Sequence, residues 1–290
     1  MRIAVLADIH GNLPALLAVL DDLATVAPDL VIAAGDFQNR GPQPREVTDL
    51  LFSRGWPMLR GNHEDYVLHQ SAGMEVTDLA DHYNWLPARW TASVTRCRLD
   101  AIRSLPIALT LEGPNGDSVV VAHGSPRSNA EGFFPSTSDR AAREMFGEPP
   151  PAVLCCGHTH FPLIRQVDST LLFNVGSVGF PFDGDQRAAY GVLSFHDGKW
   201  LAELRRVPYP VDEVIEIFRR NGFYQSVGPL GYVIRRELES ARPHLTAFYQ
   251  LFGPLLRNRR LSIFEAVDAY LEMSQTAIEE EYLKMRRKRV

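Results

Sequence analysis

The first sixty residues alternate between short apolar runs and amphipathic stretches. The apolar runs 3–7, 30–34 and 57–59 have the length of buried strands. Between them, residues 13–27 and 44–53 carry apolar side chains at helical spacing. Strands that alternate with helices in this way favour a parallel sheet whose strands are joined by right-handed crossovers.

After residue 105 the pattern changes to strands joined by tight turns. Residues 107–111 and 119–122 flank Gly113-Pro114-Asn115-Gly116-Asp117, which is typical of a hairpin turn. His196-Asp197-Gly198-Lys199 is a second turn of this kind. Further strands are predicted at 153–156, 171–175, 188–195 and 200–207. A second, more antiparallel sheet packed on the first would account for this pattern.

From Pro208 onward the pattern is helical. Ser262 and Glu265 form a potential capping box at the start of the last helix. The basic run 284–289 suits the C-terminal end of a helix, and contact with an acidic partner is the alternative. Helices are expected at 211–221, 231–240, 245–256 and 262–285. We therefore expect two parts, residues 1–207 and a helical C-terminal extension, 208–290, that packs on the first part or mediates assembly into an oligomer.

The composition is that of a globular protein, with 45% hydrophobic and 22% charged residues among 290. A net charge of −5 gives no case for general nucleic-acid binding, although bound cations would still permit a nucleotide substrate. The first strand follows Met1-Arg2 directly, which leaves no room for a signal peptide, and no apolar run reaches membrane-spanning length. We therefore expect a cytoplasmic protein without membrane contact.

Three cysteines, Cys97, Cys155 and Cys156, cannot all pair. The last two lie in the predicted strand 153–156, so buried thiols are favoured over zinc ligation, for which no CxxC partner exists.

Carboxylates, imidazoles and an amide follow the predicted strands where each strand ends. They are Asp8, His10, Asp36, Asn62, His63, Glu64, His123, His158 and His160. Ligand sites of open α/β sheets lie at the carboxyl ends of the strands. Positions i and i+2 of an extended chain point the same way, so Asp8 and His10 can approach one ion. A carboxylate such as Asp36 can bridge two cations about 3.5–4 Å apart. Imidazoles suit zinc, iron, manganese or nickel better than calcium or magnesium.

The ordered set D-x-H, G-D, G-N-H-E, H-G and G-H-x-H resembles the calcineurin-like metallophosphoesterase family over residues 1–206. The resemblance implies a two-sheet α/β sandwich flanked by helices, holding two divalent transition-metal ions. The first ion would be held by Asp8, His10, Asp36 and His160. The second would be held by Asp36, Asn62, His123 and His158. Manganese, iron, zinc and nickel all stay open.

The same resemblance implies catalytic roles for three residues. The imidazolium of His63 would neutralise charge on the phosphoryl oxygens or protonate the leaving group, and Glu64 would orient that ring. Arg40 would face the phosphate, with a surface ion pair as the alternative. Asn39 stands where many relatives have aspartate, which weakens a protein-phosphatase assignment more than it weakens metal binding.

Two further segments have two interpretations each. Residues 174–179, Asn-Val-Gly-Ser-Val-Gly, resemble a segment of the bacterial phosphodiesterase-like branch of the family, and they suit a purely structural turn equally well. The aromatic segment Tyr83–Trp90 either covers the metal site or is an ordinary packed connection, and the second is favoured. The histidines outside all motifs are expected to be exposed: His69, His82, His196 and His244.

The sequence therefore predicts a metal-dependent phosphoesterase that acts on a small phosphoester or a nucleotide. Phosphodiesters are favoured because of the resemblance to the bacterial branch and because of Asn39. A phosphomonoesterase acting on small molecules or phosphoproteins is the alternative within the enzyme class. A metal-binding scaffold without catalysis, assembled through its helical extension, is the alternative of another class.

Overall fold

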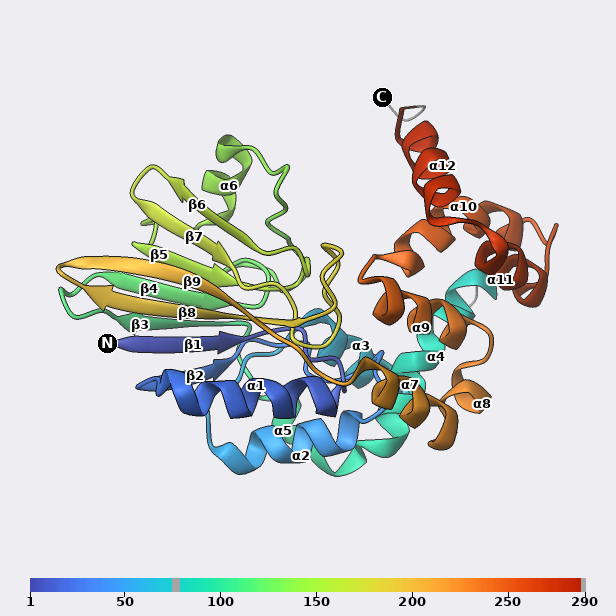
Figure 1. Cartoon of the computed structure of the whole chain (residues 1–290), viewed down its shortest axis with the longest axis horizontal. Coiled ribbons are helices and arrows are strands. Elements are labelled where there is room, and N and C mark those ends of the chain that lie inside the picture. Colours follow the sequence, from blue (N-terminus) through green and yellow to red (C-terminus); the bar gives the residue numbers. More distant parts are fainter. Residues whose placement is uncertain (75–78, 288–290) are drawn as a thin grey trace.

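The computed structural model describes residues 1–74 and 79–287 and contains two β-sheets packed face to face (Figure 1). One sheet has the order β2-β1-β8-β9, formed by Leu30–Ala33, Arg2–Leu6, Ala188–His196 and Lys199–Val207. The other has the order β3-β4-β5-β7-β6, formed by Ala108–Glu112, Ser118–Ala122, Val153–Cys156, Thr170–Asn174 and Leu163–Val167. The predicted two-sheet α/β sandwich is confirmed.

The period-2 alternation of β1 explains how the first sheet is buried on both faces. Ile3 and Val5 point toward the second sheet and pack with residues such as Val121. Ala4 and Leu6 point the other way and pack on α1 (Leu13–Val26) and α2 (Pro44–Arg54), which cover the outer face (Figure 1). The outer face of the second sheet is covered in part by α6 (Asp139–Met145).

Three details of the predicted sheets are wrong. The hairpin β8–β9 belongs to the first sheet, because β8 pairs antiparallel with β1. A hairpin pattern fixes which two strands pair with each other but not which sheet they join. The predicted strand 57–59 is reduced to one parallel bridge between Ala33 and Met58. β6 was not predicted, since its partly exposed sequence lacks a continuous apolar run.

A run of helices connects the two sheets. After the second strand and α2, the chain forms α3 (Asn62–Ser71), α4 (Leu79–Val94), a 3₁₀ turn at Arg96–Arg98 and α5 (Leu99–Arg103). Trp90 of α4 packs edge-on against Phe223 of the C-terminal helices. This segment therefore joins the sandwich to the helical extension.

Described residues 211–287 form six helices: α7 (Val211–Arg220), α8 (Phe223–Val227), α9 (Leu230–Ser240), α10 (His244–Arg257), α11 (Ile263–Glu272) and α12 (Gln275–Arg287). Their apolar side chains share one hydrophobic cluster with Phe180 and Phe182, which follow β7. The capping box of Ser262 and Glu265 is confirmed. The single helix predicted over 262–285 is wrong, because Met273 is extended (φ −68°, ψ 136°) and separates α11 from α12. Ser274 then accepts a hydrogen bond from the Ala277 amide and caps the new helix.

His244 was expected to be exposed but is buried, with 1% of its surface accessible. Its Nδ1 lies 2.7 Å from the Tyr270 hydroxyl and its Nε2 lies 2.8 Å from the Ser240 hydroxyl. The imidazole therefore ties α10 to α9 and α11.

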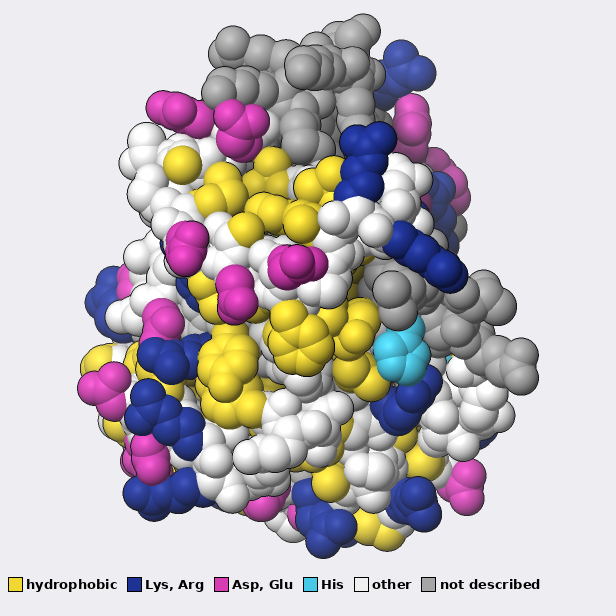
Figure 2. All heavy atoms as spheres, turned by 90° about the vertical axis from the view of Figure 1, so that its right-hand side faces the viewer, with side chains coloured by type: hydrophobic (Ala, Val, Ile, Leu, Met, Phe, Trp, Pro, Cys, Tyr) yellow, Lys and Arg dark blue, Asp and Glu magenta, His cyan; other side chains and the backbone are white. Residues whose placement is uncertain are grey.

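The helical side of the molecule carries a band of hydrophobic side chains with charged residues around it (Figure 2). Phe264 of α11 and Tyr232 of α9 are 62% and 45% exposed. Within the described residues, no helix combines the length and the apolar composition needed to cross a bilayer.

Candidate metal centre

The seven predicted metal ligands lie together at one end of the sandwich, in loops that leave both sheets. Asp8 and His10 follow β1, Asp36 follows β2, His123 follows β4, and His158 and His160 follow β5. Asn62 is the first residue of α3. The loops converge because these strands are parallel neighbours within each sheet, so their carboxyl ends share an edge.

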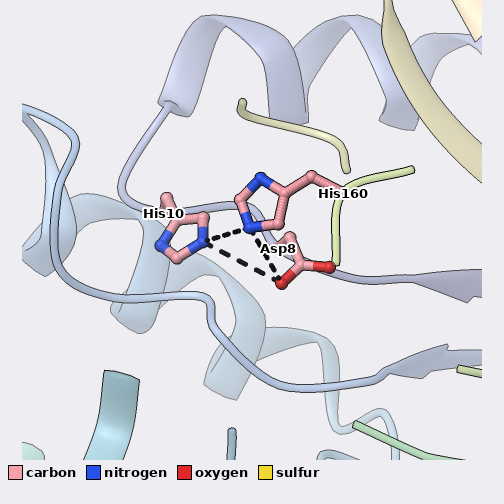
Figure 3. A group of neighbouring side chains, drawn as sticks. All are labelled: Asp8, His10 and His160. Atoms are coloured by element: carbon pink, nitrogen blue, oxygen red, sulfur yellow. Dashed lines mark hydrogen bonds and ion pairs between the residues drawn. The ribbon is translucent and has the colours of Figure 1, made fainter. Parts of the chain in front are cut away.

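Asp8, His10 and His160 form the first cluster (Figure 3). The Nε2 atoms of His10 and His160 are 3.1 Å apart. Asp8 Oδ1 lies 3.9 Å from His10 Nε2 and 3.4 Å from His160 Nε2. One carboxylate oxygen and two imidazole nitrogens thus face the same point.

Asp36, Asn62, His123 and His158 form the second cluster. The Asn62 amide oxygen lies 3.1 Å from His123 Nε2 and 2.8 Å from His158 Nδ1. Asp36 Oδ2 lies 3.3 Å from His123 Nε2 and 3.8 Å from His10 Nε2. Asp36 therefore lies between the two clusters.

Backbone carbonyls fix the orientation of three imidazoles. The Nδ1 atoms of His10, His123 and His160 lie 3.3, 2.8 and 2.5 Å from the carbonyl oxygens of Gln38, Ala34 and Phe180. Because a carbonyl oxygen only accepts, each Nδ1 carries the proton. Each Nε2 is then directed at the clusters, the arrangement usual for metal-binding histidines.

Two features of the clusters fit a bound cation. When Nδ1 carries the proton, the Nε2 atoms of His10 and His160 direct lone pairs at each other, an unfavourable contact that a shared cation would relieve. The buried Oδ1 of Asp8 has no hydrogen-bond partner among the described residues, which is costly for a carboxylate unless a cation binds it.

The backbone of the site is strained. The φ angles of Asp8, His10, Asp36, His158 and His160 are 55°, 49°, 50°, 68° and 60°, in the left-handed region that side chains disfavour. Such strain costs on the order of 1 kcal/mol at each residue and is typical of functional sites.

The predicted contact between Glu64 and the His63 ring is not found. Instead, Glu64 accepts hydrogen bonds from the backbone amides of Asp36, Gln38 and Gly61 at 2.7, 3.0 and 2.9 Å. Its carboxylate thereby holds the loop after β2 against the start of α3. A β-carbon on Gly61 would lie 2.1 Å from Asp36 Oδ1, so glycine is needed for this close approach.

Asn39, rather than Glu64, contacts the His63 ring. Its Oδ1 accepts the Arg40 amide at 2.8 Å, so its NH₂ group must donate to His63 Nδ1, also at 2.8 Å. The proton of a neutral His63 ring then lies on Nε2. Burial lowers the pKa of His63 to about 3, with Arg40 and His123 adding to the effect against Asp36. The ring is therefore neutral here, whereas an imidazolium was predicted.

Burial and neighbouring charges shift the pKa values of three groups in the clusters. Burial opposes the charged form of His123, but the Asp36 carboxylate outweighs it and raises the pKa of His123 to about 10. Burial raises the pKa of Asp8 well above its usual range. Asp36 is the stable carboxylate, because the neighbouring imidazoles of His123 and His63 outweigh its burial and lower its pKa.

Arg40 lines the site but also forms an ion pair that the sequence did not suggest. Its Nη1 lies 3.2 Å from Oε2 of Glu237, a buried residue of α9. The guanidinium also lies over the Phe182 ring, 5.6 Å from its centroid.

Residues 174–179 form a structural support for the loops that carry Asp8, His158 and His160, in agreement with the interpretation of this segment as a structural turn. The Asn174 side chain donates to the Gly157 carbonyl at 2.8 Å and to the Thr159 hydroxyl at 2.9 Å. The Ser177 hydroxyl donates to the Asp8 carbonyl at 2.7 Å. These contacts brace the loops that carry Asp8, His158 and His160.

The clusters open into a pocket of about 830 Å³. Its walls include Asp36, Arg40 and His63 from the sandwich. They also include C-terminal residues that the sequence did not indicate, namely Arg242 between α9 and α10, Thr246 and Gln250 of α10, and Gln275 and Glu279 of α12. No chain pattern links these positions to the motifs, because only tertiary packing brings them together. Tyr83, Trp85 and Trp90 are absent from the described pocket lining and pack elsewhere, which agrees with the favoured interpretation of that segment.

Comparison with known proteins agrees with this geometry. Residues 1–198 match the model of the calcineurin-like phosphoesterase superfamily domain. An uncharacterized protein of Methanocaldococcus jannaschii is 29% identical over 244 residues, which are 78% of this chain and 95% of that protein.

Two crystal structures are similar over most of their length. A metallophosphoesterase from Sphaerobacter thermophilus is 26% identical, with a TM-score of 0.65 over 83% of this chain and 99% of its own. A hypothetical protein from Pyrococcus horikoshii is 18% identical, with a TM-score of 0.67 over 82% and 97%, and supports the fold alone.

Proposed function

Because the chain belongs to the calcineurin-like phosphoesterase superfamily and is a metal-dependent phosphoester hydrolase, we propose that it holds two divalent transition-metal ions and hydrolyses phosphodiesters in preference to monoesters. The observation that supports two ions is the pair of ligand clusters on either side of Asp36. Asp8, His10, Asp36 and His160 would hold one ion, and Asp36, Asn62, His123 and His158 the other. The donors suit manganese, iron, zinc or nickel.

Ions held by these residues would supply two kinds of chemistry, namely charge neutralisation at the phosphoryl oxygens and a water acidified to near neutrality as the nucleophile. The protein fixes the ligand side chains through the three backbone carbonyls behind the imidazoles and through Glu64 behind the loop that carries Asp36. This preorganisation means that little structural change is needed when the ester binds.

His63 is the proposed catalytic side chain. Its Nε2–H is directed to the pocket side because Asn39 occupies Nδ1, and Nε2 lies 4.0 Å from Asp36 Oδ2. From this position a neutral imidazole donates a hydrogen bond to a phosphoryl oxygen or to the leaving-group oxygen. The positive charge of Arg40 lies in the same pocket and attracts the anionic ester.

The diester preference is supported by Asn39. A neutral amide beside His63 favours the uncharged ring, and a diester carries one negative charge fewer than a monoester dianion. Less positive charge is therefore needed from the protein to neutralise the transition state.

Parallel measurement of kcat/KM with bis(p-nitrophenyl) phosphate and p-nitrophenyl phosphate tests the proposal, with metal content determined on the same samples. The diester should be the better substrate. A preference of 100-fold or more for the monoester would make the protein a phosphomonoesterase. Absence of turnover with both esters in metal-loaded protein would favour a non-catalytic scaffold.

A further inference from the structure

The C-terminal helices complete the pocket above the metal clusters. Thr246 and Gln250 of α10 and Gln275 of α12 share its lining with His63, His158 and His160. Its volume of about 830 Å³ is in the range of sites that enclose a drug-sized organic molecule. A phosphate group alone would leave most of that space to water.

One wall of the pocket is a row of aromatic rings that begins at the metal cluster. The Phe182 ring stacks on His160, with centroids 4.3 Å apart and an interplanar angle of 11°. Phe161 follows at 6.4 Å from Phe182, and Phe134 follows at 6.3 Å from Phe161. Phe134 is 44% exposed although it is large and apolar. An aromatic face left open inside a pocket is suited to stack on a planar group.

The C-terminal helices add uncharged hydrogen-bonding groups to this aromatic row. Gln275 donates to Glu279 at 2.8 Å, which leaves its carbonyl oxygen available as an acceptor. Within the described residues, the Gln250 side chain has no hydrogen-bond partner. Glutamine amides recognise the donor and acceptor edge of a planar polar group without demanding a charge.

We propose that the C-terminal helices select the substrate, which is a phosphoester whose organic group is planar and of about nucleoside size. The group stacks on Phe134 and Phe161, and its polar edge hydrogen-bonds to Gln250 and Gln275. This inference rests on the proposed phosphoesterase function and specifies which ester the same site prefers.

The test uses two diesters with the same leaving group, the p-nitrophenyl ester of thymidine 5′-monophosphate and methyl p-nitrophenyl phosphate. They differ only in the organic group, so their kcat/KM ratio isolates its recognition. The full-length, manganese-loaded protein should prefer the nucleoside ester by at least about tenfold. Phe134→Ala and Gln250→Ala should each lower kcat/KM for the nucleoside ester roughly fivefold or more, as expected for the loss of one stacking or hydrogen-bonding contact. Both variants should leave the methyl ester within about twofold of the unaltered protein.

Phe264→Ala is the matched control, because Phe264 is an exposed phenylalanine of the same helical part and does not line the pocket. It should leave both esters unchanged. Equal kcat/KM for the two esters, or variants that lower both esters alike, would overturn the inference while leaving the phosphoesterase function intact. Absence of turnover with both esters would refute the proposed function itself, and this inference with it.

Discussion

Removal of the two proposed metal ions should lower the melting temperature (Tm) of the protein. The size of the decrease depends on how many ions are bound. A ligand that binds only the folded state stabilises it by about 2.7 kcal/mol at a concentration of 100 Kd. For 290 residues, the entropy of unfolding is roughly 0.6 kcal/mol/K at about 2.1 cal/mol/K per residue. One ion therefore raises the Tm by about 4–5 °C, and two ions by about 9 °C.

Variants that each alter one cluster distinguish the contributions of the two proposed ions to the Tm. His160 belongs to the cluster with Asp8 and His10, whereas His158 faces Asn62. His160→Ala and His158→Ala should each retain about half of the metal-dependent shift, and Asp36→Asn, which touches both clusters, should lose most of it. Comparing each variant with and without metal cancels the effect of the substitution on the fold.

The assay is calorimetric unfolding of chelated and metal-reloaded protein, with metal content measured by elemental analysis. His196→Ala is the control, since this imidazole is exposed in a hairpin turn far along the chain from the clusters and belongs to neither. A shift below about 1 °C on chelation would refute the assignment of the clusters as metal sites. Equal shifts in all three variants would refute the division into two sites.

His63→Ala should lower kcat by about 10²–10⁴-fold, the usual contribution of one proton-donating group, with metal content unchanged by elemental analysis. Asn39→Asp should raise the pKa of His63 from about 3 by roughly 1–3 units, because a carboxylate stabilises the imidazolium. An NMR titration of the metal-free protein measures this pKa. An unchanged pKa would show that the contact with residue 39 does not control the ring. Since the pKa of His123 is raised from 6.5 to about 10, its proton stabilises the metal-free fold fully below pH 6.5, and that stability is lost as the pH rises through 10. Metal affinity measured by calorimetry should therefore increase over this interval, and a flat profile would contradict the pairing of His123 with Asp36. Glu237→Gln should lower the free energy of unfolding by about 2 kcal/mol, because Arg40 loses its charged partner. Urea titration measures this change, and an unchanged unfolding midpoint would show that the ion pair does not contribute to stability.

The local pattern of the sequence determined most of the elements and the residues that form the candidate metal centre. Residues directly after strands can be found from the chain alone because strands end where apolar runs end. The parallel arrangement of neighbouring strands then requires their carboxyl ends to meet. Asp8, His10, Asp36, His123, His158 and His160 were all identified in this way and lie together.

The partners of those side chains were harder to predict. Glu64 was assigned to His63 from a resemblance, but the chain turns into α3 at Asn62 and directs the carboxylate to backbone amides. Asn39 reaches His63 because its backbone adopts a positive φ of 63°. At such strained positions, tertiary packing sets the direction of the side chain, so the order of residues along the chain does not predict it.

The sequence by itself determined the fold class, the catalytic family and the carboxylates and imidazoles of the candidate metal centre, because each depends on residue type and on order along the chain. The division at residues 207 and 208 stays a prediction. Only the tertiary structure decided that β8 and β9 complete the first sheet, that Glu237 pairs with Arg40, and that α10 and α12 form part of the pocket wall. These contacts join segments that lie far apart in the sequence, such as those of Arg40 and Glu237. Packing of apolar surfaces brings such segments together, and because the hydrophobic effect is non-directional, the sequence pattern does not show which surfaces will meet.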